Sequence, residues 1–293
     1  MVFYKFYFSI MQMNYPVLYD TQRIKFDKLR SNEDILYLFK QIFNRDFDDN
    51  LLNWLSSCPT GSNKWYAAFD IDIPIGIYGL LPINIRLGNN IYNAALCNNV
   101  GVVKNFQGKG LFQSLGEYAL KDSNFPIVVG VPNSKAVKGH KRIGWKTYGN
   151  IELLQGVTSD ISPEYITNSY FQYFPKEENK YFSVVKGLDF IKWRYSRPYY
   201  SYFQSVFENQ KYVIWKVYEG RKQILETNDF RLAIKLGGTV DIWQFNGSSE
   251  SSYLKERGFV PLMSNEFILY TNLPISLNSP DQFCFELGDN DVF

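Results

Sequence analysis

The stretch VGVVKNFQGKGLF, residues 100–112 of this 293-residue chain, decides the fold. Its first part is apolar and has the pattern of a strand that ends near Val103. The glycine loop Gln107-Gly108-Lys109-Gly110 follows at once. Apolar residues then recur at helical spacing, at Leu111, Phe112, Leu115, Tyr118 and Ala119. The stretch therefore predicts a strand, a glycine loop and a helix in direct succession.

The glycine loop has the position and composition of a phosphate-binding site. Unpaired N–H groups and the positive end of the helix dipole gather where a helix begins, and glycines let the backbone approach a pyrophosphate closely. Two other kinds of phosphate loop fail on these residues. A Walker A loop requires Ser or Thr where this chain has Gly110, and the dinucleotide fingerprint requires a third glycine where it has Gln113.

The loop resembles the acetyl-CoA signature of the Gcn5-related N-acetyltransferases. In that family a Gln or Arg precedes Gly-x-Gly and a small residue, just after a strand that carries Val, and here Val102 precedes Gln107 at the family spacing. Phe112 stands where the family usually has Gly or Ala, so it is expected to crowd the pyrophosphate turn. The resemblance implies acetyl-CoA or another short acyl-CoA as cofactor, and no metal. The implied cofactor-binding residues are Val100, Val102, Gln107, Gly108, Lys109, Gly110, Leu111, Phe112 and Asn133.

A second family motif follows the first in order. Asn133 is predicted to end a strand, Ala136 comes three residues later, and Gly144-Trp145 stands where Gly-Phe is usual. His140, the only histidine, falls where the family usually has Tyr. The resemblance makes His140 and Asn133 the candidate catalytic residues. His140 is expected to protonate the leaving CoA thiolate, whose thiol has a pKa of about 8.5, as an imidazolium or through a neutral N–H.

The family fold gives these motifs a common physical logic. It is a mixed α/β fold with a central, mostly antiparallel sheet, and its strands near Val102 and Val131 are expected to splay apart. Free main-chain groups there are expected to pair with the pantetheine arm, and an N–H near Val102 to stabilise the oxyanion formed by amine attack. Transfer is expected to be direct, in a ternary complex, because Cys97 lies in an apolar strand where a thiol is usually inert.

Two assignments stay open at the level of sequence. His140 is either the acid or a surface histidine on a polar helix that also carries Lys138, Lys141 and Arg142. The base for the incoming ammonium is not singled out. Its candidates are Asp241, Asp289 and Asp291.

The length favours two domains, a catalytic domain at residues 1–160 and a second domain at residues 161–293. The second is predicted to be a degenerate Gcn5-related copy of the first, because residues 246–259 echo residues 133–145. It lacks a second Gln-x-x-Gly-x-Gly loop, so one CoA site per chain is expected and the second domain contributes to the acceptor site. Residues 229–236 are predicted to be a helix stopped by two glycines.

The acceptor is suggested by a subgroup resemblance. Residues 190–195 and 287–291 look like phrases of tandem-domain acetyltransferases from surface-polysaccharide gene sets. Those enzymes N-acylate a nucleotide-linked amino sugar, such as a dTDP-linked 3-amino-3,6-dideoxyhexose, with acetyl- or 3-hydroxybutyryl-CoA. Arg194 or Arg197 would meet the diphosphate. The candidate substrate-binding residues are Trp193, Arg194, Asp241 and Asp289, although Trp193 is better explained as a core anchor.

Composition excludes several other classes. A net charge of +2 with scattered cations argues against a nucleic-acid partner. Three cysteines and one histidine do not make a zinc site or a disulfide framework, which favours a reducing cytoplasm. The apolar N-terminal decapeptide has no cleavage signal, and no window reaches the roughly 18 to 20 apolar residues that cross a bilayer.

Three rival functions remain beside the amino-sugar acyltransferase. The first is acylation of a protein, peptide or other small amine. The second resembles the tandem-domain aminoacyl-tRNA-dependent peptidoglycan transferases, which lack the CoA loop and need a basic tRNA surface. The third is a non-catalytic module, either an acyl-CoA sensor, which would bind CoA without turnover, or a sugar-binding module.

Overall fold

The computed structural model describes residues 23–45, 47–160, 163, 165–168, 171, 172, 174 and 180–290. Within them the strands form one sheet in the order β1-β2-β3-β4-β5-β13-β6-β12-β11-β10-β9-β7, and β8 pairs with both β3 and β14. The strands are β1 (Ile24–Lys28), β2 (Lys64–Asp70), β3 (Ile73–Leu87), β4 (Asn90–Val102), β5 (Ile127–Gly130), β6 (Lys146–Asp160), β7 (Tyr165–Thr167), β8 (Phe182–Val184), β9 (Tyr202–Phe207), β10 (Lys211–Tyr218), β11 (Arg221–Thr227), β12 (Leu236–Phe245), β13 (Val260–Thr271) and β14 (Phe283–Cys284). The helices are α1 (Asn32–Leu38), which continues into a π-helix η2 (Phe39–Phe43), α2 (Asp49–Ser56), α3 (Leu111–Ser123), α4 (Ser134–Arg142), α5 (Leu188–Arg194), α6 (Ser249–Lys255), α7 (Leu287–Asn290) and the 3₁₀-helices η3 (Lys104–Phe106), η4 (Glu208–Gln210), η5 (Phe230–Lys235) and η6 (Pro280–Gln282).

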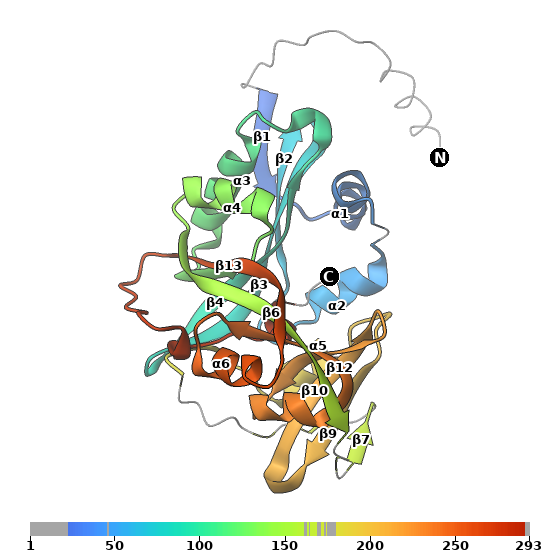
Figure 1. Ribbon diagram of the computed structural model, residues 1–293. Coiled ribbons are helices and arrows are strands. Elements are labelled where there is room, and N and C mark those ends of the chain that lie inside the picture. Colours follow the sequence, from blue (N-terminus) through green and yellow to red (C-terminus); the bar gives the residue numbers. More distant parts are fainter. Residues whose placement is uncertain are drawn as a thin grey trace.

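Helices cover both faces of the first part of the sheet. Figure 1 shows α1 and α2 on one side of strands β1 to β4 and α3 and α4 on the other. The sequence of β2 explains this arrangement, since successive side chains of a strand point to opposite faces. Trp65 and Ala67 pack in the core with α1 and α2, whereas Tyr66 and Ala68 pack in the core with α3. Both faces of the strand are therefore buried.

The sheet has an approximate two-fold symmetry that relates the two halves of the chain. The pairs β4–β5 and β11–β12 are both parallel, and the pairs β5–β13 and β12–β6 are both antiparallel. At the centre, β13 and β6 pair with each other. Each half thus contributes one strand to the other half. In Figure 1 the green strand β6 runs down into the yellow and orange strands of the second half.

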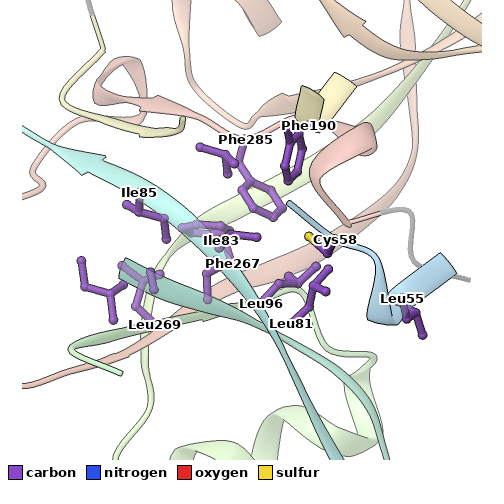
Figure 2. Close-up of a cluster of buried hydrophobic side chains, with 14 of the residues drawn as sticks. Leu55, Cys58, Leu81, Ile83, Ile85, Leu96, Phe190, Phe267, Leu269 and Phe285 are labelled. Carbon is purple, nitrogen blue, oxygen red and sulfur yellow. The ribbon is translucent and has the colours of Figure 1, made fainter. Parts of the chain in front are cut away.

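One of the hydrophobic cores joins the two halves. Figure 2 shows Ile83 of β3 and Leu96 of β4 beside Phe267 of β13, with Phe190 of α5 and Phe285 close by. Phe267 is fully buried and its ring contacts that of Phe285 with centroids 5.1 Å apart. The proposed division into residues 1–160 and 161–293 stays a prediction, and residues 161, 162 and 164 of the expected boundary lie outside the described part of the chain. So does the N-terminal apolar segment at residues 1–22.

Residues 133–145 and 246–259, which are expected to resemble each other, end in the same hydrogen-bonding pattern. At the end of α4, Trp145 N–H donates to the carbonyl of His140, and at the end of α6, Phe259 N–H donates to that of Leu254. The intervening Gly144 and Gly258 both have positive φ, 94° and 84°. His140 thus corresponds to Leu254, which is a fully buried core residue.

The helix predicted over residues 229–236 is wrong in type and length. Only η5 forms there, a 3₁₀-helix of six residues, and β12 already begins at Leu236. Gly237 and Gly238 lie inside that strand, with φ of 71° and 77°, and stop no helix. The apolar spacing that suggested an α-helix is satisfied by burial of Leu232 and Ala233 within a single short segment. In the symmetric arrangement η5 occupies the place of α3.

No described helix is long and apolar enough to cross a bilayer. Within the same residues no group of three or more His, Cys, Asp or Glu side chains is placed to hold a metal ion.

Candidate active site

Strands β4 and β5 separate after a short parallel contact. They pair only at Ala95 with Val128 and at Leu96 with Val129, although β4 continues to Val102. The gap opens into a cavity of about 370 Å³, here called the central cleft. Its walls are formed by Phe39, Phe43, Arg45, Cys97, Asn98, Asn99, Val100, Gly130, Val131, Pro132, Asn133, Ala136, His140, Trp145, Ile268 and Asn290. The geometry is the splay that the sequence predicted near Val102 and Val131.

A bulge in β4 shapes the wall of the cleft. The register with β3 shifts between Ile77 and Gly79, so that Asn99 and Val100 stand opposite a single residue. Asn99 adopts a left-handed conformation with φ of 48°. Gly79 is required at this point, because a Cβ there would lie 2.4 Å from the Asn98 side-chain oxygen.

Beyond the bulge, alternate main-chain groups of β4 turn away from β3. Val103 N–H donates to the carbonyl of Ile75 in β3, at 2.8 Å. Because successive residues of a strand point their N–H and C=O groups in opposite directions, those of Val102 face away from β3. The Val102 carbonyl accepts a hydrogen bond from the Gln107 side chain at 2.8 Å. Gln107 therefore fastens the glycine loop to the strand.

The glycine loop forms the N-terminus of α3. Gly108 and Gly110 have φ of 78° and 79°, and a Cβ at either position would find no atom within 4 Å. Gly110 is the N-cap residue, and its carbonyl accepts from Gln113 N–H at 3.0 Å. The N–H groups of Leu111 and Phe112 precede this first helical bond, so they are of the kind that a helix leaves for an external acceptor.

A second cavity, here called the loop cavity, lies against these groups. It measures about 540 Å³ and adjoins the central cleft, with which it shares Phe43, Val100, Asn133 and Ala136. The rest of its wall comprises Ile42, Gly101, Val102, Phe106, Gln107, Gly108, Gly110, Leu111, Phe112, Gln113, Lys135, Gly139 and Arg142. Lys135 and Arg142 add positive charge to the helix N-terminus, which suits a phosphate-bearing ligand.

Phe112 does not have the crowding effect that its size suggests. Its ring packs on α4, where a Cβ on Gly139 would lie only 2.5 Å from it. The ring also meets His140 edge-on, with centroids 5.1 Å apart. The absence of a side chain at Gly139 thus makes room for the large residue, and the loop keeps an open turn.

The fold has counterparts among solved structures. A GCN5-related N-acetyltransferase from Anabaena variabilis ATCC 29413 matches with a TM-score of 0.61 and 13% identity, over 84% of this chain and 72% of that chain. The fold is that of the Gcn5-related N-acetyltransferases. A putative acetyltransferase from Pyrococcus horikoshii matches with 0.62 and 13% identity over 96% and 99% of the two chains, and Eis1 from Mycobacterium abscessus with 0.57 and 12% over 85% and 73%. No family model and no curated protein matches the sequence.

Within this acetyltransferase fold, Asn133 holds α4 in place. Its side-chain oxygen accepts from the N–H groups of Lys135 at 3.1 Å and Ala136 at 3.0 Å, which makes it the N-cap. Asn133 also lines both cavities. The structure shows a positioning role for this side chain, and its expected catalytic role stays a prediction.

His140 is buried, not a surface residue. Only 3% of it is exposed, and its Nδ1 lies 3.4 Å from the Tyr78 hydroxyl. Burial lowers the pKa of His140 to about 4. The ring lines the central cleft but is neutral at pH 7, so the imidazolium role expected from the sequence does not fit and only a neutral N–H is left.

Cys97 lines the central cleft but is a poor nucleophile. Burial raises the pKa of its thiol to about 12, so the thiolate is scarce at neutral pH. The neighbouring Tyr78 is also fully buried, and burial raises its pKa well above the ordinary value for tyrosine. Both groups stay protonated at pH 7.

The four side chains expected to bind the acceptor lie in the interior, and the described walls of the central cleft include none of them. Trp193 stacks on Trp54 with centroids 4.9 Å apart, and each indole N–H donates to the other's carbonyl. Arg194 donates to the Gly288 carbonyl at 2.7 Å. Trp193 therefore has the core role that the sequence favoured.

Asp241 and Asp289 also have partners inside the protein. Asp241 is fully buried and accepts from the Gln155 side chain at 2.9 Å. Asp289 pairs with Lys186 at 2.7 Å. Neither carboxylate faces the described cleft as a base, and the third candidate, Asp291, lies outside the described residues.

The sequence did not point to several cleft residues that the structure brings together. Asn98 and Asn99 are 2% and 5% exposed, and Asn98 donates to Asn63 at 2.8 Å. A polar pair between the apolar runs at residues 94–97 and 100–103 is a signal that could have found them. Arg45 and Asn290 carry no comparable signal, because only tertiary contacts bring them to the cleft.

Proposed function

We propose that the chain is an acyl-CoA-dependent N-acyltransferase that acts on the amino group of a nucleotide-linked amino sugar, in a ternary complex. One observation carries the first part: a splayed-strand cleft is continuous with a cavity at the N-terminus of α3. The acetyltransferase fold supports the same activity. Acetyl-CoA or 3-hydroxybutyryl-CoA is the proposed donor, as the sequence resemblance implies.

The residues of the two cavities suit an acyl-CoA. The N–H groups at Gly108, Gly110, Leu111 and Phe112 would receive the pyrophosphate, and the open positions beside the two glycines leave room for it. The N–H group of Val102, which faces away from β3, would pair with an amide carbonyl of the pantetheine arm, as an added strand does.

The chemistry asked of the protein is modest. When bound, acyl-CoA supplies an activated carbonyl carbon: the bond from the neutral amine nitrogen forms, the bond to sulfur breaks, and the proton that the nitrogen loses would pass through solvent to the thiolate, which leaves as the CoA thiol. Main-chain N–H groups of β4 would stabilise the charge on the carbonyl oxygen. Neutral His140 would offer an N–H to the departing sulfur, without transferring its proton as an imidazolium would. The protonated state of Cys97 favours direct transfer over an acyl-enzyme.

The test is turnover with defined amines. Purified protein, acetyl-CoA and a panel of nucleotide-linked amino sugars should release free CoA thiol and yield the acylated sugar, identified by its mass. Acetyl-CoA binding without release on any amine would indicate a binding module. Release with peptide amines but with none of the sugars would indicate a protein acetyltransferase, and would overturn the acceptor proposed here.

A further inference from the structure

A third cavity adjoins the central cleft on the side away from the loop cavity. It measures about 410 Å³ and is lined by Phe39, Arg45, Phe47, Leu51, Arg197, Tyr199, Tyr200 and Tyr218. We call it the tyrosine cavity. It shares Phe39 and Arg45 with the central cleft and no residue with the loop cavity. The three cavities therefore form a row with the central cleft in the middle.

This order separates the two ends of the site. The loop cavity has the unpaired helix N–H groups that suit the cofactor's pyrophosphate. An acceptor amine that meets the thioester in the central cleft then has the opposite end, the tyrosine cavity, for the rest of its molecule. The segment from η2 to α2 forms one wall along the whole row, with Ile42 in the loop cavity, Arg45 in the cleft and Phe47 in the tyrosine cavity.

The tyrosine cavity combines rings and guanidinium groups. Tyr199, Tyr200 and Tyr218 are 69%, 38% and 44% exposed, unusually accessible for large aromatic residues. Arg197 is only 5% exposed, and its guanidinium packs over the Tyr200 ring, 4.6 Å from the ring centroid. Arg45 is exposed at the junction with the central cleft. Exposed rings stack on planar bases, and guanidinium groups bind phosphates in bidentate fashion.

Tyr199 is held in position although it is exposed. Its backbone has φ of 69°, a left-handed conformation that costs energy in a residue with a side chain. Its hydroxyl donates to the carboxylate of Asp48 and accepts from the Asn50 amide at 3.0 Å. Asp48 caps α2 through Leu51 N–H. The ring is thereby fixed as a wall before any ligand binds, which lowers the entropy cost of stacking.

We propose that the tyrosine cavity binds the nucleoside diphosphate part of the acceptor, with the base against Tyr199, Tyr200 and Tyr218 and the diphosphate at the exposed Arg45. The sugar amine then reaches the central cleft past Phe39. This inference rests on the proposed function, because it names where that acceptor is recognised. It replaces Arg194 and Trp193, which are occupied in the core.

The experiment measures binding of free dTDP, UDP and GDP to the full chain by calorimetry, with acetyl-CoA as a separate titrant. Tyr199→Gly removes a ring and relieves the left-handed strain, so it is expected to fold. Arg45→Ala removes an exposed charge. Each variant should bind the best-binding nucleoside diphosphate with an affinity lower by about tenfold or more. Tyr37→Ala and Arg30→Ala, at exposed residues outside the three cavities, are the matched controls.

The outcomes separate this inference from the proposed function. Nucleotide binding that is lost in Tyr199→Gly and Arg45→Ala, but kept in both controls, supports it. If no nucleoside diphosphate binds at millimolar concentration, or the two variants bind as the wild type does, the inference is wrong even when acetyl-CoA binds and amines are acylated. If acetyl-CoA itself does not bind the wild type, the acyltransferase proposal fails instead.

Discussion

Burial of the His140 ring lowers its pKa from 6.5 to about 4, so the folded state contains the neutral form. Between these values the unfolded chain binds a proton that the folded chain does not, and the free energy of unfolding therefore falls as the pH is lowered. A shift of this size corresponds to about 3 kcal/mol. We expect urea unfolding to show this loss between pH 6.5 and pH 4, and His140→Phe to show less of it.

The same residue can be observed directly, because it is the only histidine in the chain. The ring protons of the intact protein should titrate in proton NMR spectra with a midpoint near 4. A midpoint near 6.5 would mean that the ring is solvated, and would restore the imidazolium as a proton donor at the pH of turnover.

A neutral His140 should still affect the transition state if its N–H meets the departing sulfur. His140→Phe keeps a flat ring among Tyr78, Phe112 and Trp145 but removes the donor. We expect kcat to fall by about 10- to 100-fold while acetyl-CoA affinity stays nearly unchanged. Wild-type kcat in this variant, under conditions where chemistry limits the rate, would leave His140 with a packing role like that of Leu254.

At the scale of the element, the N-terminus of α3 depends on two left-handed glycines. Gly110→Glu places a negative side chain in open space where a pyrophosphate would lie, and acetyl-CoA binding should be lost. Gly220→Glu is the matched control, because Gly220 has a similar φ of 76° and equally open surroundings in the turn between β10 and β11. The control should bear the same backbone strain and still bind acetyl-CoA. Equal loss in both variants would trace the effect to strain.

The elements also show which features of the fold and site can be predicted from the sequence. The loop at Gln107 and the turn at Gly144 were predictable, because their chemistry is local and depends on fixed spacing. The exchange of β6 and β13 depends on pairing between distant residues, such as Ile268 with Gly130, for which spacing gives no signal. For the same reason, nothing in the sequence indicated that Arg194 and Asp241 are buried rather than placed to bind the acceptor. A charged residue looks alike in sequence whether it meets a ligand or a buried partner.

At the scale of the whole molecule, a buried charge cluster ties the last helix to the second half of the sheet. Lys186 Nζ lies 3.2, 2.9 and 2.7 Å from carboxylates of Glu226, Glu286 and Asp289. Burial opposes the charge on Lys186, but the three carboxylates outweigh it, and the pKa of Lys186 lies well above its usual value. Asp289 belongs to α7, whose last residue, Asn290, lines the central cleft.

Lys186→Met should therefore be strongly destabilising, since it removes the cation that pairs with the buried carboxylates of Glu226 and Asp289 and the partly buried one of Glu286. We expect a loss of about 3 to 5 kcal/mol at pH 7 in urea unfolding. The loss should shrink in acid, where protonated carboxyl groups no longer repel one another. Lys192→Met, at an exposed lysine of α5, is the control and should cost less than about 0.5 kcal/mol. A loss for Lys186→Met as small as that for Lys192→Met would show that the cluster contributes little to stability.

The symmetry of the sheet raises the question of a second cofactor site, since the second half has its own cavity at the matching place. This cavity of about 580 Å³ is lined at the start of η5 by Asp229, Phe230 and Arg231. The Asp229 carboxylate accepts from Arg231 N–H at 3.1 Å and lies 2.7 Å from Lys211 Nζ. Burial opposes its charge, but Arg231 and Lys211 outweigh this and lower the pKa of Asp229.

At η5 the ionised Asp229 carboxylate already accepts from the Arg231 N–H group and pairs with the side chains of Arg231 and Lys211. It would therefore repel an anion bound there. The helix has six residues, against 13 in α3, and it lacks the two open left-handed glycines. Calorimetry should therefore give one acetyl-CoA per chain for the wild type, and none for Gly110→Glu. Two sites per chain would show that the second half also binds the cofactor, and binding that survives in Gly110→Glu would place the site away from the glycine loop.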